Sequence, residues 1–572
     1  MIIEKVNIEG FRNFSNLTAN LKESTLIIGA NDVGKTNLIY ALRLLLDKSL
    51  SERDIEPEIT DFHISKNGNQ AETFSITVFF KDISEDAALS TLKGNVSDNG
   101  CSVFKLVANR NTLDYQISIG SNDAELGDVP SRFYLKYINM RYVQSQRDLK
   151  KFINIEKKQL LRLSQDSREL AETEADDLQL DKISRGLDNI NKRVKNLNYV
   201  KGSTSLVNDE LKKLSHNYAD YEVQLDAGAI KVHQFIDNLE LGASTAGSQL
   251  MLGGDGRNNQ ILLALWKAKS EREFDPDNEV IFYCIEEPEA HLHPHQQRKL
   301  ADYLIKELSG QTLITSHSPQ IAARYKPDSI ANLISKNNST IAASEGCSDC
   351  ISDAWDDMGY RMSILPAESF FSSCVFLVEG PSERLFYQEL AIIIGIDLDY
   401  YNITILSVDG IQFEVYTSIL NALEISWVVR TDNDVSKVPH KDEKNLAGIN
   451  RCMKITGQAP YPPKKDLITT ANTLVEDGTW LEASSKINPL RIYLSKIDLE
   501  SDLALEMPDE LKAYSGKNNI DDAVKYIQTK KAIRMREFLL QNKAKLKDIE
   551  TGELIKPLNH AKQIVEGLHR DA

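Results

Sequence analysis

The chain has 572 residues, of which 41% are hydrophobic and 26% are charged, and its formal net charge at pH 7 is −17. It is too long for one hydrophobic core, since domains average roughly 150 residues, so we expect three or four domains. The acidic balance argues against a protein coated with nucleic acid. No apolar run reaches the ~20 residues of a membrane span, and the alternating start MIIEKVNIEGFRNF lacks a signal-peptide layout, which predicts a cytoplasmic location without membrane contact.

The region from residue 511 to the end departs from the acidic average. It contains 13 Lys or Arg residues and 8 Asp or Glu residues, which gives a local net charge of +5. A basic segment fits contact with the phosphates of DNA, whereas a solvated helix face is the commoner cause of such a run. Charge alone leaves both interpretations open.

A nucleotide site is predicted in the first segment, residues 1–150. The run TLIIGANDVGKTNLIYALRLLL contains an apolar strand, an eight-residue phosphate-binding loop and an amphipathic helix, in that order. In such a loop the glycines turn backbone N–H groups towards phosphates, Lys35 reaches the β and γ oxygens, and the Thr36 hydroxyl is placed for Mg²⁺. The pattern predicts a site for ATP with Mg²⁺. Its candidate contacts are Gly29, Asn31, Gly34, Lys35, Thr36 and Asn37.

The rest of this site is expected in residues 241–345. The apolar strand in EVIFYCIEEPEAHLHPHQQ ends at Glu286, in the place of a Walker B acid that holds the metal's water shell, and the next acid, Glu287, would polarise an attacking water. A further strand, in QTLITSHSPQIAA, ends near His317, which is placed to sense a γ-phosphate. Upstream, the glycine-rich MLGGDGRNNQILLAL leads into a helix, which suits an anion site made of backbone amides.

Together these pieces resemble the ABC-type ATPase head of the SMC, Rad50 and RecF proteins. The resemblance implies that Gly254 and Gly256 belong to a degenerate signature motif that contacts ATP bound by a partner subunit, and that His317 is the switch histidine. It also implies a Q-loop in YINMRYVQSQRDL, with Gln146 or Gln144 as the candidate. Because ABC heads complete each active site across two subunits, a homodimer or homotetramer is expected.

An inserted helical segment is predicted at residues 151–240. Apolar residues there step by four and three positions, with polar residues on the other faces, which is the pattern of a coiled-coil seam. Those residues are Ile183, Leu187, Ile190, Val194 and Leu197. The seam favours a helical hairpin or a dimer contact, and packing within the chain is an equally good alternative.

A second set of strands begins in residues 346–572, and its strands end in acids. CVFLVEG ends at Glu379, EISWVVRTDNDV closes with Asp432 and Asp434, and SKIDLESDLALEMP adds Glu500. Strands that alternate with helices form a parallel α/β sheet, whose functional groups gather at the carboxyl ends of the strands. Carboxylates that converge repel one another unless cations neutralise them, and such oxygen ligands favour Mg²⁺ or Mn²⁺. Two such ions are the usual arrangement for attack on a phosphodiester.

The order glutamate-glycine, glycine at the next strand end, and Asp-x-Asp resembles a Toprim domain. An ABC ATPase followed by a Toprim domain resembles the OLD (overcoming lysogenization defect) nucleases over nearly the whole chain, and FRNF, NDVGKTN and YALRLLLD are similar to the nuclease subunits of Gabija anti-phage systems. The resemblance implies that Lys531, or its neighbour Lys530, stabilises charge on the scissile phosphate. It also implies five metal ligands or supports of ligands: Glu379, Glu383, Asp432, Asp434 and Glu500.

We therefore expect an α/β protein: an ABC-type ATPase head with an inserted helical dimerisation segment, followed by a Toprim domain with basic C-terminal helices. The function that the resemblance implies is a nucleotide-regulated, metal-dependent DNA endonuclease in bacterial defence against phage, with a UvrD-like helicase partner, GajB. The alternative is a RecF- or SMC-like DNA-binding ATPase whose Toprim domain is not catalytic. A topoisomerase is a third option, but it needs a tyrosine nucleophile on a separate domain, for which the chain has no spare length.

Overall fold

The structure, a computed structural model, divides into two compact units. The first unit comprises Met1–Ser145, Pro276–Glu289 and Pro294–Ala572, and the second comprises Gln146–Asp275 and Ala290–His293. No described helix is long and apolar enough to cross a membrane. The structure describes residues 1–144, 149–200, 279–308, 310–350, 364–408, 410 and 412–571, with short stretches between residues 202 and 268.

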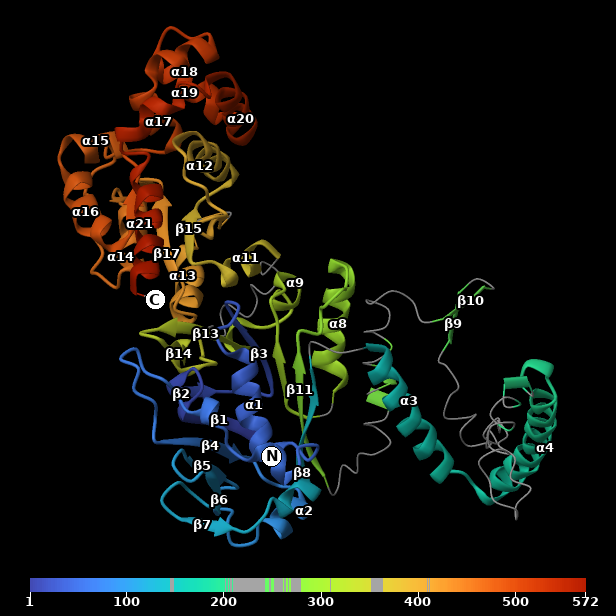
Figure 1. The fold of residues 1–572 in the computed structure, drawn as a ribbon. Coiled ribbons are helices and arrows are strands. Elements are labelled where there is room, and N and C mark those ends of the chain that lie inside the picture. Colours follow the sequence, from blue (N-terminus) through green and yellow to red (C-terminus); the bar gives the residue numbers. More distant parts are fainter. Residues whose placement is uncertain are drawn as a thin grey trace, which may run out of the picture. The chain divides into compact units, whose positions relative to one another are not determined.

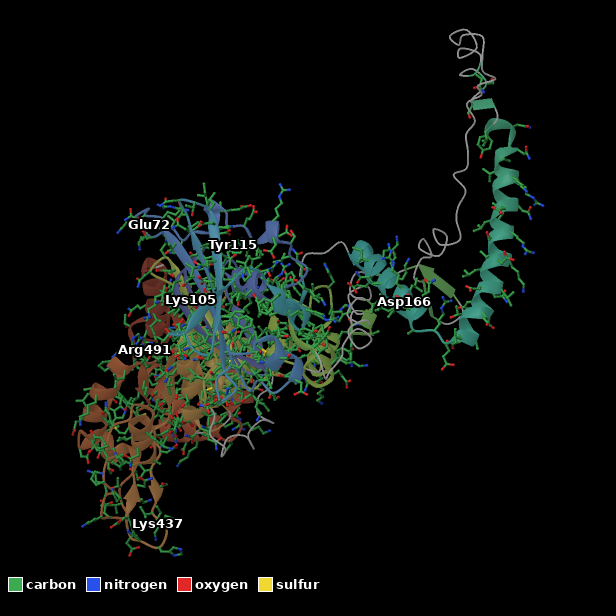
Figure 2. The ribbon with its side chains drawn as sticks, turned by 90° about the horizontal axis from the view of Figure 1, so that it is seen from below. Glu72, Lys105, Tyr115, Asp166, Lys437 and Arg491 are labelled. Atoms are coloured by element: carbon green, nitrogen blue, oxygen red, sulfur yellow. The ribbon has the colours of Figure 1, made fainter. Side chains whose placement is uncertain are left out.

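The first unit begins with an antiparallel sheet in the order β2-β1-β4-β5-β6-β7. Its strands are β1 (Ile2–Phe11), β2 (Phe14–Asn20), β4 (Thr73–Lys81), β5 (Ser102–Asn109), β6 (Asp114–Gly120) and β7 (Leu126–Val129). Buried and more exposed positions alternate along β4, β5 and β6, as they do in a sheet that covers a core with one face. Lys105 on β5 and Tyr115 on β6 mark this sheet in Figure 2.

A second sheet has the order β14-β13-β3-β12-β11-β8 and is parallel except for the β13–β14 hairpin. Its strands are β3 (Ser24–Gly29), β8 (Ile138–Val143), β11 (Val280–Glu286), β12 (Thr312–Thr315), β13 (Ile330–Lys336) and β14 (Ser339–Ala342). Every residue of β11 and β12 is buried, as expected for parallel strands that are covered on both faces. Since β12 lies between β3 and β11, the carboxyl ends of these three strands are neighbours. The helices that accompany the sheet are α1 (Lys35–Leu46), α8 (Pro294–Glu307) and α9 (Pro319–Ala322).

The C-terminal part of the first unit, from Ile364 onwards, is built on a parallel sheet in the order β16-β15-β17-β20. Because the sequence predicts a Toprim domain here, we refer to this part as the Toprim region. Its strands are β15 (Cys374–Val378), β16 (Ile403–Ser407), β17 (Ser426–Thr431) and β20 (Ile492–Leu494). The C-terminal helix α21 (Lys556–Asp571) packs on β15 and β17, and α12 (Pro381–Ile394) follows β15. Because β15 and β17 are adjacent, the residues that follow them meet at one edge of the sheet.

Further helices complete this region, and α17 to α20 gather beyond α12 (Figure 1). They share one apolar core with α12 and the sheet, which includes Phe386, Leu503 and Phe538. A small hairpin of β18 (Ser436–Lys437) and β19 (Lys444–Asn445) follows β17, and Lys437 lies on its outside (Figure 2). The helices are α13 (Phe413–Ala422), α14 (Ala447–Ile455), α15 (Ala471–Glu476), α16 (Thr479–Ile487), α17 (Leu499–Glu506), α18 (Pro508–Ser515), α19 (Ile520–Gln528) and α20 (Lys531–Asn542).

The second unit contains the predicted helical insertion. Its described elements are α3 (Leu149–Asp166), α4 (Leu170–Lys195), β9 (Gly242–Thr245) and β10 (Ser248–Met251). The predicted seam lies mainly on α4, where Leu187 is buried, whereas Ile183 and Ile190 are 40% and 53% exposed. Part of the seam is therefore uncovered by the described residues, and the dimer contact and the packing within the chain both stay predictions.

One buried side chain joins the two N-terminal sheets. Gln311, just before β12, accepts a hydrogen bond from the backbone N–H of Ile3 at 2.8 Å and donates to the carbonyl of Ile3 at 2.7 Å. Its amide also lies 3.1 Å from the carbonyl of Lys22. The amide thus satisfies backbone groups of β1 and of the segment that leads into β3, which fixes the antiparallel sheet against the parallel one.

We predict that Gln311→Leu loosens this junction. The substitution leaves buried backbone groups without partners, which costs roughly 1–3 kcal/mol. The amide of Ile3 should then exchange with solvent roughly tenfold faster in hydrogen–deuterium exchange. The control is Gln116→Leu on the exposed side of β6, which should leave the exchange of Ile3 unchanged. Equal exchange in the Gln311→Leu variant and the unmutated protein would contradict the role given to Gln311.

Candidate functional site

The predicted phosphate-binding loop connects β3 to α1 in a conformation that requires glycine. Gly29 and Gly34 have φ angles of +149° and +100°, a region that favours glycine. A Cβ atom on Gly29 would lie 2.5 Å from the carbonyl oxygen of Leu333, and one on Gly34 would lie 2.0 Å from the amide nitrogen of Asn13. The loop is therefore tightly enclosed on one side. The other predicted loop contacts, Asn31 and Thr36, are exposed.

Lys35 turns back over this loop. Its ammonium donates to the carbonyl oxygens of Gly29 at 3.0 Å and Ala30 at 2.8 Å. Burial lowers the pKa of Lys35, and the negative charge of Glu287 opposes that shift. The Lys35 ammonium is partly desolvated, so a charge-assisted hydrogen bond to a phosphate oxygen would stabilise it strongly. The loop therefore fits the triphosphate that the sequence predicted.

Asn37 occupies a different position from the other predicted loop contacts. Its amide donates to Asn13 at 2.6 Å, and its carbonyl oxygen accepts from the guanidinium of Arg12 at 2.9 Å. Asn13 also donates to the carbonyl of Val33 in the loop at 2.9 Å. These bonds tie the start of α1 to β1 and β2, so Asn37 braces the loop in this structure.

Glu286 ends β11 as a buried carboxylate. One of its oxygens accepts a hydrogen bond from the Tyr142 hydroxyl at 2.9 Å, and among the described residues the other has no hydrogen-bond partner. Burial, together with the charge of Glu286, raises the pKa of Tyr142, so the phenol remains a donor. A buried oxygen without a donor is what a hydrated Mg²⁺ would satisfy, so Glu286 fits the metal that accompanies ATP.

His317 and Glu287 meet at the carboxyl ends of β12 and β11. His317 Nε2 lies 3.4 Å from Glu287 Oε1. Burial and the positive charge of Lys35 lower the pKa of His317, which keeps the imidazole neutral near pH 7. The backbone N–H of His317 donates to Glu289 at 2.8 Å, and the Ser316 hydroxyl donates to the same oxygen at 2.7 Å. Sequence reasoning missed Glu289, although it follows the predicted acid pair by two residues.

Three predicted nucleotide contacts lie outside the described residues. They are Gln146, Gly254 and Gly256. The alternative Q-loop residue, Gln144, is described and exposed. The Q-loop and the signature motif therefore stay predictions.

The acids of the Toprim sheet meet as predicted at the carboxyl ends of its strands. Glu379 follows β15, Asp432 follows β17, and Glu383 lies in the first turn of α12. Together with Lys531, the first residue of α20, they line a pocket of about 220 Å³. The pocket has the size and the oxygen donors that suit hydrated divalent cations.

Glu379 is held against the strand that carries Asp432. One oxygen of Glu379 accepts from the backbone N–H of Asp432 at 2.8 Å and from the Thr431 hydroxyl at 2.5 Å. The carboxylate of Asp432 in turn accepts from the Ser495 hydroxyl at 3.2 Å. The two acids therefore have fixed positions on adjacent strands.

The negative charge in this pocket is only partly compensated. Glu383, Asp432 and Glu500 are buried, and burial raises the pKa of each; the charge of Glu379 adds to the shift of Asp432. Lys531 Nζ lies 3.4 Å from Glu500 Oε2. Partial burial lowers the pKa of Lys531, but Glu500 and Asp432 outweigh this effect and raise it. Within the described ranges no three ligand-type side chains stand as a ready-made metal cage, yet the excess of buried carboxylates fits a divalent cation.

Two arginines that sequence reasoning missed touch the predicted acids. Arg451 pairs with Asp434 and with Glu379, at 2.5 Å in each case, and Asp434 is not among the residues that line the pocket. Arg430 is buried in β17, 2.8 Å from Asp502 and 4.0 Å from Asp432. An arginine inside the apolar strand SWVVRT was a usable signal for Arg430, whereas nothing in the sequence pointed to Arg451.

A larger cavity of about 1110 Å³ adjoins both parts of the first unit. It is lined by the phosphate-binding loop and His317, by the β13–β14 hairpin, and by Phe370 and Ser373 at the start of the Toprim region. The hairpin contacts both sides: Thr340 on β14 donates to the carbonyl of Val33 at 2.7 Å, and Asn332 on β13 donates to the carbonyl of Leu423 at 2.8 Å.

The raised pKa of Asp432 predicts a pH-dependent stability. A carboxyl whose pKa is higher in the folded than in the unfolded chain stabilises the fold below about pH 4, and that contribution is lost as pH rises through the folded pKa. Relative to Asp432→Asn, the unmutated protein should therefore lose stability from about pH 4 upwards, by up to about 1.4 kcal/mol per pH unit. Thermal unfolding in the presence of chelator, at several pH values, measures the difference in stability between the two proteins. A difference that does not change with pH would contradict the raised pKa of Asp432.

Comparison with known proteins agrees with both parts of this architecture. Residues 1–126 and 118–322 match the AAA ATPase domain family, and residues 370–434 match the TOPRIM domain of overcoming lysogenization defect-like proteins. Endonuclease GajA of Bacillus cereus (strain VD045) is 25% identical over 94% of this chain and 95% of its own length. The Old nuclease of Escherichia phage P2 is 23% identical over 77% of this chain and 79% of its own.

Among solved structures, an Smc head bound to the C-terminal winged-helix domain of ScpA aligns with 60% of this chain and 97% of its own, at 18% identity and a TM-score of 0.37. The matches to the two domain families confirm the predicted α/β fold class, with an ATPase part followed by a Toprim part. The chain belongs to the AAA ATPase domain family, and this domain is followed in the sequence by a Toprim domain of the overcoming lysogenization defect type.

Proposed function

We propose that this protein is a nucleotide-regulated, metal-dependent endonuclease that nicks or cuts DNA in bacterial defence against phage. The observation that carries the proposal is the pocket in which Glu379, Glu383 and Asp432 meet Lys531 with too little positive charge to balance them. Relatives named as an endonuclease and as a nuclease, which align over most of the chain, support the same reaction class. DNA is the substrate in this proposal.

The cations of the nuclease centre would be Mg²⁺ or Mn²⁺, in a pair. Glu379, Glu383 and Asp432 would hold them, with Glu500 beside the pocket and Asp434 recruited from its pairing with Arg451. Two such ions supply a nucleophilic water and stabilise the leaving oxygen of a phosphodiester.

Lys531 is the proposed catalytic lysine of this centre. It lines the pocket, and its ammonium stays protonated beside Glu500 and Asp432, so it is placed to stabilise charge on a phosphate. Its neighbour Lys530 is not among the residues that line the pocket, and this favours Lys531 over Lys530.

ATP with Mg²⁺ would bind at the phosphate-binding loop. Lys35 and Thr36 would meet the phosphates and the metal, Glu286 would hold the water shell of the metal, and Glu287 with His317 would face the γ-phosphate. Gly254, Gly256 and Gln146 would complete the site.

The β13–β14 hairpin offers a route by which nucleotide could control cleavage. It is bonded to the loop through Thr340 and Val33, and to the Toprim region through Asn332 and Leu423. Leu423 is the C-cap of α13 and shortly precedes β17, and Asp432 directly follows β17. A shift of the loop on binding ATP would therefore reach the strand that holds a proposed metal ligand.

The proposed setting is the bacterial cytoplasm, with the chain as a homodimer or homotetramer. The uncovered positions Ile183 and Ile190 on α4 support self-association, because an exposed apolar seam at coiled-coil spacing suits a second copy of the same helix. A UvrD-like helicase, GajB, is the proposed partner, as in the Gabija systems that the N-terminal motifs resemble.

We predict that the purified protein converts supercoiled plasmid to nicked or linear DNA with Mg²⁺ or Mn²⁺, and that chelator abolishes cleavage. Glu379→Ala and Lys531→Ala should each reduce the rate by at least about a hundredfold, because each removes a group at the reacting phosphate. Lys530→Ala is the matched control and should retain most activity. Lys35→Ala should abolish the response to ATP.

Full cleavage by Glu379→Ala would rule out the proposed centre. ATP-dependent retention of DNA without strand breaks, over several DNA forms and metals, would favour a RecF- or SMC-like binding ATPase with a non-catalytic Toprim domain. Relaxation of the plasmid with religation would instead indicate a topoisomerase.

A further inference from the structure

Arg451 stands between two acids that are proposed to bind metal. Its side chain is 9% exposed. One guanidinium nitrogen donates to Glu379 Oε1 and to the Thr431 hydroxyl, and another donates to Asp434 Oδ2. Arg451 thus brings a positive charge to the acids that follow β15 and β17.

Helix α14, which carries Arg451, packs closely against the segment from Asp432 to Asp434. A Cβ atom on Gly448, in the first turn of α14, would lie 2.4 Å from the carbonyl of Asp432 and 2.7 Å from the backbone nitrogen of Asp434. The N–H of Gly448 donates to the carbonyl of Asp434 at 2.9 Å. Arg451 lies about one turn further along the same helix, so close packing at Gly448 sets its approach to the acids.

The guanidinium makes the kind of interaction that a bound cation would have to replace. Two nitrogens of the planar Arg451 guanidinium each donate to a different carboxylate, and such charge-assisted hydrogen bonds are strong. Among the described residues, neither Glu383 nor Asp432 has a guanidinium this close; Arg430 lies 4.0 Å from Asp432 and is bonded to Asp502. Glu379 and Asp434 are therefore the acids whose charge is already compensated in the cation-free protein.

We propose that Arg451 is a positioning residue that acts as an internal counter-cation: it holds Glu379 and Asp434 in the cation-free protein and competes with divalent cations for them. For a cation to bind these acids, Arg451 must give up its hydrogen bond to Glu379, to Asp434 or to both. Arg451 thereby raises the concentration of Mg²⁺ or Mn²⁺ at which the centre fills. The inference rests on the proposed function, because it concerns the cation site of the same centre.

The test is the affinity of the full-length protein for Mn²⁺ without DNA or nucleotide, measured by electron paramagnetic resonance of free Mn²⁺. Arg451→Met removes the competing charge and keeps much of the side-chain volume, so Mn²⁺ should bind about tenfold more tightly. Arg451→Lys keeps a charge that cannot span both acids and should give an intermediate affinity. Lys454→Met is the matched control, because Lys454 lies on the same helix, is 70% exposed and pairs with Glu414; its affinity should equal that of the unmutated protein.

The outcomes separate this inference from the proposed function. Unchanged or weaker Mn²⁺ binding in folded Arg451→Met, with normal binding in the unmutated protein, overturns the counter-cation role and leaves the cation site standing. If Arg451→Met does not fold, the Arg451→Lys variant provides the test: Mn²⁺ binding that is unchanged or weaker than in the unmutated protein overturns the counter-cation role. Absence of a Mn²⁺ site that depends on Glu379, shown with Glu379→Gln in the same assay, overturns the cation site and the role of Arg451 with it.

Discussion

Mutual repulsion among buried carboxylates is the constraint on which the Toprim region depends. Parallel strands bring Glu379 and Asp432 to one sheet edge, and α12 and α17 add Glu383 and Glu500. Ionised carboxylates at such short range destabilise one another unless positive charge is present. Side chains on neighbouring elements supply part of this positive charge, and we propose that cations supply the rest.

The positive charges are arranged in two layers around the acids. Arg430 is buried beneath Asp432 and bonded to Asp502, so it belongs to the fixed interior of the domain. The pairing with Asp502 offsets part of the cost of burying a charge inside β17, and removing either partner would be strongly destabilising. Lys531 lines the pocket, and Arg451 pairs with Glu379, which lines it too. Arg430 thus supports the acids from the interior, and Lys531 and Arg451 are the charges that we propose to meet substrate and cation.

In the ATPase part, too, charged groups meet at the carboxyl ends of neighbouring parallel strands. There β3, β12 and β11 bring the phosphate-binding loop, His317 and Glu286 together, with Lys35 held between the loop carbonyls and the acids. The β13–β14 hairpin contacts this loop through Thr340 and the Toprim region through Asn332. The phosphate-binding loop and the carboxylate pocket therefore lie in one unit, and the parts that carry them contact the same hairpin.

The sequence predicted these sites where local order determines position, and missed them where tertiary packing does. Glu379 and Asp432 could be placed because an acid at the end of a buried parallel strand must lie at the sheet edge. The pairing of Arg451 and the bracing role of Asn37 depend on helix packing and on contacts between distant strands, which no local pattern encodes. Asp434 belongs to the same motif as Asp432, yet it pairs with Arg451 and is not among the residues that line the pocket.

The most direct test of the charge deficit is the proton balance of Mn²⁺ binding to the metal-free protein, measured by titration calorimetry near neutral pH in buffers of different ionisation enthalpy. Burial raises the pKa values of Glu383, Asp432 and Glu500, and a bound cation would lower them again, so cation binding should release protons from these carboxyls. We predict net proton release on binding, reduced in Asp432→Asn. Mn²⁺ binding without proton release, or no binding at all, would contradict the account.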